Sequence, residues 1–157
     1  MTKAKNGRLL GIHIKNYRAL KDLRLGQVKY AEGDPLPGLA CFIVPNGCGK
    51  STLLDAFGFI ADCLLDGVET ACDKPWRGGF QHLRTQGRTE PIEFELFFDD
   101  GESNRPIVYQ LRVDEVKSVP VVVQETLRQR RKGEVRGKPY YFLKLEQGKG
   151  KVWAGDY

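Results

Sequence analysis

The stretch Val44-Pro45-Asn46-Gly47-Cys48-Gly49-Lys50-Ser51-Thr52 decides the fold of this chain of 157 residues. It follows the apolar run 39–44 and precedes a periodic segment that begins at Leu53. A strand that leads through a glycine-rich turn into a helix directs backbone N–H groups and the positive end of the helix dipole at one point. An anion can bind there. The stretch therefore predicts a phosphate-binding loop in an α/β domain.

The residue types in this loop indicate ATP and Mg²⁺ as ligands. The ammonium of Lys50 would reach the β- and γ-phosphates, and the Ser51 hydroxyl would coordinate Mg²⁺. The candidate nucleotide-binding residues of the loop are Asn46, Gly47, Cys48, Gly49, Lys50, Ser51 and Thr52.

Val44 departs from the usual pattern G-x-x-x-x-G-K-[ST], whose first glycine falls at this position. Valine is β-branched, and Pro45 restricts it to extended backbone angles, so Val44 cannot adopt a conformation reserved for glycine without strain. Two outcomes stay open. The remaining residues form a working phosphate cradle, or Val44 has abolished nucleotide binding.

Composition places the chain among soluble cytoplasmic proteins. Its length suits one domain or one lobe of a larger domain. The longest apolar runs fall well short of a bilayer span, and the N-terminus lacks the apolar segment of a signal peptide. The four cysteines form no C-x-x-C pair, which favours reduced thiols, with Cys41 and Cys63 expected in the core.

The first half of the sequence predicts two strands, a central strand and one long helix. Apolar residues alternate from Leu10 to Val28, and the run 39–44 is apolar on both faces, as in a strand covered by helices. A helix is expected over residues 50–66, with Gly67 as its stop. Its buried stripe would consist of Leu53, Phe57, Ile60 and Leu64. Residues 68–90 should be irregular, anchored by burial of Trp76 and Phe80.

From Ile92 onward the pattern predicts an antiparallel sheet. Apolar residues alternate with polar ones in the segments 92–98 and 107–113, and three further strands are expected over 119–127, 140–146 and 151–153. We therefore divide the chain into a β/α core over residues 1–66, an irregular connection over 67–90 and an antiparallel β-subdomain over 91–157.

Positive charge is concentrated near the C-terminus. The whole chain carries a net charge of +5, whereas residues 128–151 hold nine cations against two acids. The segment is a candidate DNA-contact surface. The competing interpretation is a set of solvated hairpin tips protected by cations.

Three further features carry alternative interpretations. The strand that ends at Asp99 has the shape of a magnesium-site strand, but Glu93 and Glu95 alternate with its apolar residues and favour a half-solvated hairpin. Gly78-Gly79 favours a turn over a nucleotide-sensing signature loop. His13, on an alternating strand, is expected at the surface rather than in a catalytic site.

The order of motifs resembles a known family. The segments Ile14-Lys15-Asn16-Tyr17-Arg18-Ala19-Leu20 and 45–56, separated by a loop that contains acidic residues and prolines, are similar to the N-terminal lobe of RecF and SMC-like ATPases. More narrowly, they resemble bacterial AAA-family ATPases with an ABC-type head. The resemblance implies a P-loop lobe of ABC/RecF-like type with an antiparallel β-subdomain.

The resemblance also implies a site and partners. Asn16 and Arg18 fall where such ATPases approach the nucleotide phosphates. No residue is assigned a catalytic role, because the later motifs of the family are not found in this sequence. The chain is thus expected to be the front part of a longer ATPase that binds ATP with little or no turnover alone. Its partners would be the remainder of the head or a second head in a homodimer, in DNA metabolism or defence against foreign nucleic acid.

Two rival functions stay open at this point. The first is a small self-contained P-loop kinase or GTPase that uses Asp99 as its magnesium ligand. The second is a non-enzymatic nucleic-acid-binding module that uses residues 128–151.

Overall fold

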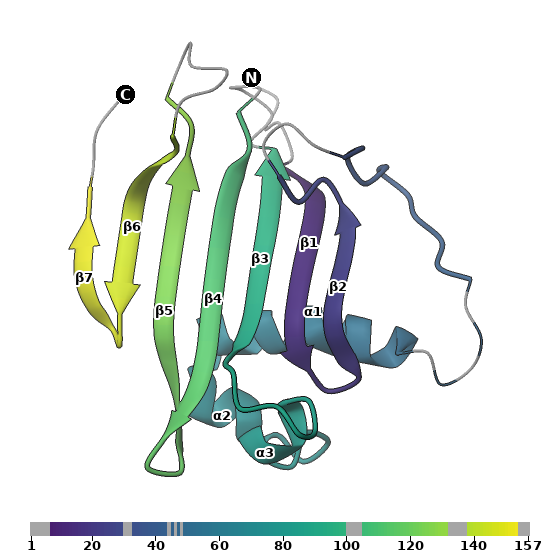
Figure 1. The fold of residues 1–157 in the computed structure, drawn as a ribbon, viewed down its shortest axis with the longest axis vertical. Coiled ribbons are helices and arrows are strands. Elements are labelled where there is room, and N and C mark those ends of the chain that lie inside the picture. Colours follow the sequence, from purple (N-terminus) through teal and green to yellow (C-terminus); the bar gives the residue numbers. More distant parts are fainter. Residues whose placement is uncertain are drawn as a thin grey trace.

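The structure is a computed structural model that describes residues 7–29, 33–43, 45, 47, 49–99, 105–131 and 138–153. Within these ranges it contains a sheet of seven strands in the order β2-β1-β3-β4-β5-β6-β7 and three helices (Figure 1). The strands are β1 (Arg8–Tyr17), β2 (Leu20–Gly26), β3 (Ile92–Asp99), β4 (Ile107–Val116), β5 (Val119–Gln129), β6 (Tyr140–Glu146) and β7 (Lys149–Val152). The helices are α1 (Lys50–Asp66), α2 (Val68–Asp73) and α3 (Phe80–Leu83).

Every neighbouring pair of strands is antiparallel. The predicted hairpins β3–β4 and β4–β5 are confirmed, as is the pair of strands at the N-terminus. The N-terminal pair β1–β2 and the later strands β3 to β7 share one sheet because β1 pairs with β3. In this pairing Ile12 lies opposite Leu96 and Ile14 opposite Phe94. The fold is therefore mixed α/β with an antiparallel sheet that runs through both halves of the chain.

The three helices lie behind one face of the sheet, across the lower half of the view in Figure 1. Side chains of β1, β3 and β4 on this face form the core together with those of the helices. At its centre, the Phe59 ring of α1 lies 5.5 Å from Tyr17 and 5.8 Å from Phe94, between ring centroids. These contacts fix α1 across the sheet.

The predicted bounds of the helix over residues 50–66 are confirmed, and Gly67 follows it with a positive φ of 87°. The set of residues predicted to form the buried side of this helix is wrong in part. Leu53 and Ile60 are buried, but the other core positions are Ala56 and Phe59. The expected Phe57 and Leu64 are exposed instead. The helix is rotated relative to the prediction because the sheet packs against its Phe59 side.

The predicted central strand over residues 39–44 is wrong for the part that the structure describes. Residues 40–43 have no strand structure, and the side chains of Leu39 and Ile43 are 90% and 91% exposed. Cys41, expected in the core, is exposed as well. A strand needs hydrogen bonds from a neighbour, and no described strand pairs with this segment. Val44 lies outside the described residues.

Residues 68–90 are more ordered than expected. They include the helices α2 and α3, and α3 begins after the Gly78-Gly79 turn, where both residues have positive φ. Phe80 is buried as predicted, whereas the prediction for Trp76 is wrong because its side chain is 64% exposed.

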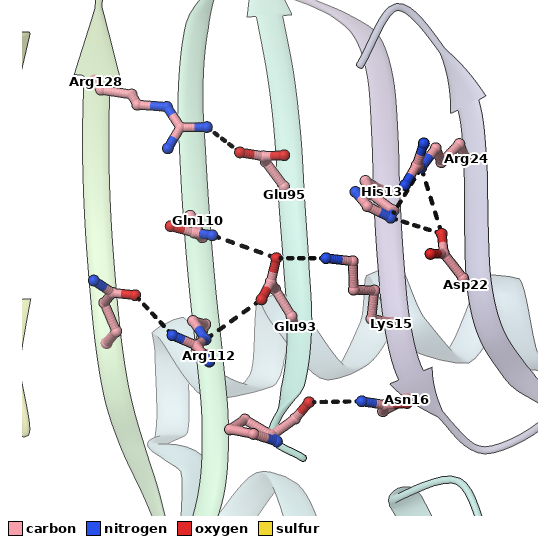
Figure 2. A network of polar contacts seen from close by, with 12 residues as sticks. His13, Lys15, Asn16, Asp22, Arg24, Glu93, Glu95, Gln110, Arg112 and Arg128 are labelled. Atoms are coloured by element: carbon pink, nitrogen blue, oxygen red, sulfur yellow. Dashed lines mark hydrogen bonds and ion pairs between the residues drawn. The ribbon is translucent and has the colours of Figure 1, made fainter. Parts of the chain in front are cut away.

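The sheet face opposite the helices is polar over the part that Figure 2 shows, and a small apolar cluster of Leu10, Phe97 and Val108 is buried toward the Asp99 end of the same face. Cross-strand pairing aligns polar side chains in a row over all seven strands, and their charges alternate except at the neutral Gln124. The row consists of Asp22, Lys15, Glu93, Arg112, Gln124, Glu146 and Lys149. Opposite charges on facing strands stabilise a sheet by about 0.2–1 kcal/mol per pair. The charged part of this face is therefore stabilised by pairs between strands.

His13 lies in the same face and corrects another prediction. Its exposed fraction is 8%, and its Nε2 lies 2.8 Å from the Asp22 carboxylate and 3.2 Å from Arg24 Nε. The expectation of a surface histidine fails because the long side chains beside it cover the ring.

Candidate functional site: the start of the long helix

The backbone before α1 has the conformation that a phosphate-binding turn requires. Gly47 has a φ of 83° and Gly49, the N-cap of α1, a φ of 93°. A side chain at either position would be strained, and a Cβ at Gly49 would also lie 3.2 Å from Leu20 Cδ2. The predicted ligands Asn46 and Cys48 lie outside the described residues.

The N-terminus of α1 is open to an anion. No described side chain caps it, and its first turn contains no acidic residue. The first intrahelical bond in this turn runs from Leu53 N–H to the Gly49 carbonyl, so the N–H groups of Lys50, Ser51 and Thr52 precede the helical ladder. The helix dipole adds positive potential at the same point.

Lys50 and Ser51 lie in the first turn of α1, and their contacts with nucleotide and metal stay predictions. The Lys50 ammonium donates a hydrogen bond of 3.1 Å to the Pro45 carbonyl, so it folds back over the turn. Ser51 is exposed and Thr52 is half-buried, both in the first turn of α1. These groups fit a nucleotide triphosphate with Mg²⁺: N–H donors, one ammonium and one hydroxyl converge on one helix end.

Asn16 lies near the end of β1 and Arg18 in the tight connection to β2, and both have positive φ. Asn16 is buried, and its side chain donates a hydrogen bond of 3.2 Å to the Pro91 carbonyl. Arg18 donates to the Trp76 carbonyl at 3.0 Å and lies 3.4 Å from the Asp55 carboxylate. The structure thus places Arg18 beside α1, and the nucleotide contacts of both residues stay predictions.

An ion-pair network that the sequence did not indicate supports α1. Arg77 is only 3% exposed, and its guanidinium lies 3.1 Å from Asp55 and 2.6 Å from Asp62, two residues of α1 seven positions apart. Tyr17 donates a hydrogen bond of 2.5 Å to Asp55. Burial, and then the neighbouring Asp55, raise the pKa of Tyr17, so it remains a donor at neutral pH. The only signal in the sequence is the spacing of the two aspartates, which puts them on one side of a helix.

Asp99 lies far from this site. It pairs with Arg8 at one end of β1, whereas Gly49 approaches Leu20, which pairs with Tyr17 at the other end. Nine residue steps along β1 correspond to about 30 Å, and Mg²⁺ ligands lie about 2 Å from the ion. Asp99 therefore cannot share a magnesium ion with Ser51, and the self-contained kinase or GTPase loses its key residue.

An apolar pocket of about 350 Å³ lies next to the start of α1. Its walls come from the leucines of β2, from the exposed segment around Phe42 and from the outer side of α1. The lining residues are Leu20, Leu23, Leu25, Phe42, Gly49, Lys50, Leu53, Leu54 and Phe57. The pocket shows that apolar surface continues from the phosphate turn along one side of α1.

Within the described ranges, no group of three or more His, Cys, Asp or Glu side chains could hold a metal ion. No described helix is both long enough and apolar enough to cross a membrane.

A positive-φ glycine at an uncapped helix start, followed by lysine and serine, defines the class of P-loop nucleotide-binding domains. The sequence model of the family described as "AAA domain, putative AbiEii toxin, Type IV TA system" matches residues 40–151. The chain belongs to this family, and it contains a P-loop ATP-binding domain of AAA type. No curated protein and no solved structure gives a significant match to the chain.

Proposed function

We propose that this chain is the ATP-binding N-terminal lobe of an ABC-type ATPase head related to the RecF and SMC-like proteins. The observation that carries the proposal is the start of α1, where Gly49 opens an uncapped helix and the Lys50 ammonium lies over the turn. ATP with Mg²⁺ would bind there through the N–H groups of the first turn, with Lys50 on the phosphates and Ser51 on the metal.

The exposed apolar surface supports a partner that completes the head. Beside the segment 39–43, the outer side of α1 exposes several large side chains to solvent: Leu54, Phe57, Leu64 and Leu65. Contiguous apolar surface of this kind marks an interaction site. The remainder of an ATPase head would cover this surface, and strands paired with residues 39–44 would give that segment the hydrogen bonds it lacks.

Slow turnover by the lobe alone follows from the residues present. Catalysis of phosphoryl transfer needs a positioned water or nucleophile and stabilisation of the charge that develops on the phosphates. The described site has Lys50 and Ser51, but the carboxylate of Asp99 is too distant to take part. A second head in a homodimer would provide the missing groups, and ATP-driven closure would act in DNA metabolism or defence against foreign nucleic acid.

The basic segment 128–151 is the weaker support for a nucleic-acid role. Arg128 pairs with Glu95, and Lys144 lies 3.3 Å from Glu146, so part of its charge is already balanced inside the sheet. Lys149 and Lys151 are exposed on β7. A purely nucleic-acid-binding module would bind DNA with a steep salt dependence and would not respond to ATP.

A fluorescent ATP analogue tests the site. The chain should bind the analogue more tightly with Mg²⁺ than with EDTA, and Ser51→Ala should remove most of this difference because the hydroxyl is the metal ligand. The matched control is Ser118→Ala, in the turn between β4 and β5, which should leave the Mg²⁺ response unchanged. Equal affinity in Mg²⁺ and EDTA for the unaltered chain would contradict the assignment of Ser51.

A further inference from the structure

A second hollow, of about 800 Å³, opens beside the connection between β1 and β2. Its walls come from three parts of the chain: the β1–β2 connection with the start of β2, helix α3, and the segment that follows α3. The lining residues are Arg18, Ala19, Lys21, Gln81, His82, Arg84, Thr85 and Gln86. Three of them are permanent cations, and none is acidic.

The walls of this hollow are held together by backbone contacts. Arg18 N–H donates a hydrogen bond of 2.6 Å to the Leu83 carbonyl, and Thr85 N–H donates one of 3.0 Å to the Asn16 carbonyl. The Thr85 hydroxyl adds a bond of 2.8 Å to the Arg18 carbonyl. The segment after α3 is thereby fixed against the end of β1, so the basic side chains project from a rigid frame.

Hydrogen-bond donors remain available around the hollow. Lys21 and His82 are exposed and make no side-chain hydrogen bond or ion pair with another described residue. Arg84 lies 3.0 Å from Asp114 and stacks over Phe80 with 5.0 Å between guanidinium and ring centroid. A guanidinium has five N–H donors, and the contacts of Arg84 with protein acceptors use only its Nη1.

We propose that this hollow binds the phosphate backbone of a nucleic-acid strand. Clustered Lys and Arg side chains are the usual partners of backbone phosphates. Arg18 and Arg84 each pair with one aspartate, Asp55 at 3.4 Å and Asp114 at 3.0 Å, so among the described residues Lys21 is the lining cation that no acid pairs with. The hollow is wider than one phosphate group, and planar side chains beside the cations, such as His82 and Gln86, can contact unstacked bases. Trp76 is also exposed, and Arg18 donates a hydrogen bond to its backbone carbonyl.

This site lies away from the β5–β6 hairpin of the basic segment, whereas it is at the same end of β1 as the start of α1, and its Arg18 is also one of the predicted nucleotide-binding residues. The tip of the β5–β6 hairpin follows Gln129, which pairs with Ile107 at the Asp99 end of the sheet. The hollow lies at the opposite end, beside Tyr17. The assignment adds to ATP binding and does not depend on it, so its test contains no nucleotide triphosphate.

Fluorescence anisotropy of the full chain with a labelled oligothymidylate of about 15 nucleotides, at about 50 mM salt, tests the assignment. Lys21→Glu should weaken binding about five- to tenfold by removing a phosphate contact, and His82→Glu should weaken it by a similar factor because a carboxylate replaces a ring that can contact bases and repels the phosphates. The matched control Lys29→Glu changes the charge equally, but Lys29 lies beyond Gly26, the far end of β2, which is about 17 Å along the strand from Lys21. It should change affinity less than about twofold. Binding should fall with salt with a log–log slope near −2, for about three phosphate contacts.

Other results would overturn the assignment. One is equal weakening by Lys21→Glu and Lys29→Glu, and another is the absence of oligonucleotide binding by the unaltered chain. A third is loss of binding with Arg131→Glu but not with Lys21→Glu, which would place the strand on the basic hairpin instead. Displacement by inorganic triphosphate at the same phosphate concentration would identify a small anion as the ligand. Both hollow variants change exposed side chains, and their urea unfolding curves should match that of the unaltered chain.

Discussion

The Arg77 guanidinium lies 2.6 Å from the Asp62 carboxylate, and this pair joins the turn before α3 to the C-terminal half of α1. The same guanidinium reaches Asp55 at 3.1 Å and donates to the Ala71 carbonyl at 2.9 Å. One buried side chain therefore connects α1, α2 and the turn before α3. Because Asp55 also accepts the Tyr17 hydrogen bond, the network sets the position of the helix that begins at the phosphate turn.

Arg77→Met should lower the free energy of unfolding by about 3 kcal/mol, because removal of one partner leaves two carboxylates in a partly buried site. Urea unfolding monitored by circular dichroism measures the change. The matched control is Arg88→Met, since Arg88 is exposed and lies 3.7 Å from Glu90. An exposed pair contributes at most about 1 kcal/mol. Equal effects of the two substitutions would contradict a structural role for Arg77.

Asp62 makes this network sensitive to acid. Its hydrogen bond from Lys74, and then that from Arg77, hold the pKa of Asp62 below its usual value of 3.8. Because the pKa of Asp62 is lower in the folded chain than in the unfolded chain, its ionised carboxylate stabilises the fold above the unfolded-state pKa. This stabilisation is lost as pH falls through the folded-state pKa. The unaltered chain should therefore lose stability below about pH 4. Asp62→Asn should flatten this part of the stability curve, measured by urea midpoints at each pH, and an unchanged slope would contradict the assignment.

Leu53 and Leu54 lie on opposite sides of α1, and we expect their substitutions to have very different effects on stability. Leu53 faces the core with 9% exposure, whereas Leu54 is 73% exposed on the side proposed to meet the rest of the head. Leu53→Ala should cost about 2–5 kcal/mol of unfolding free energy, and Leu54→Ala less than about 0.5 kcal/mol. Chemical denaturation of the two variants measures both values. A large cost for Leu54→Ala would mean that this side is already covered.

The cysteines should differ in reactivity. Burial raises the pKa of the Cys63 and Cys72 thiols to about 12, whereas Cys41 is exposed. Because the thiolate is the nucleophile, brief alkylation of the native chain at pH 8 should label Cys41 and spare the two buried cysteines, as read by peptide mass spectrometry. The neutral thiols of Cys63 and Cys72 contribute fully to the stability of the fold below their unfolded-state pKa of 9.0. This contribution is lost as pH rises through their folded-state pKa of about 12. Equal labelling of all three in the native chain would contradict their burial.

Local patterns in the sequence predicted most of the secondary structure. The bounds of α1 and the alternation in β1, β3 and β4 follow from periodicity, and the phosphate turn follows from glycines at positions with positive φ. The failures share one physical cause, because burial depends on partners that periodicity does not identify. The stripe of α1 depends on how Phe59 meets the sheet, and residues 39–43 need a neighbouring strand. Arg77 could not be predicted because its two aspartates meet it only after the chain folds.

Calorimetric titration of Mg-ATP into the chain, with Lys50→Ala as the paired variant, tests the central claim most directly. The account predicts micromolar binding to the unaltered chain and at least about a tenfold loss in Lys50→Ala, or about 1.4 kcal/mol, because the ammonium contacts the phosphates. Urea unfolding of the variant checks that it is folded. Equal binding by both proteins, or no binding by either, would contradict a nucleotide site at the start of α1.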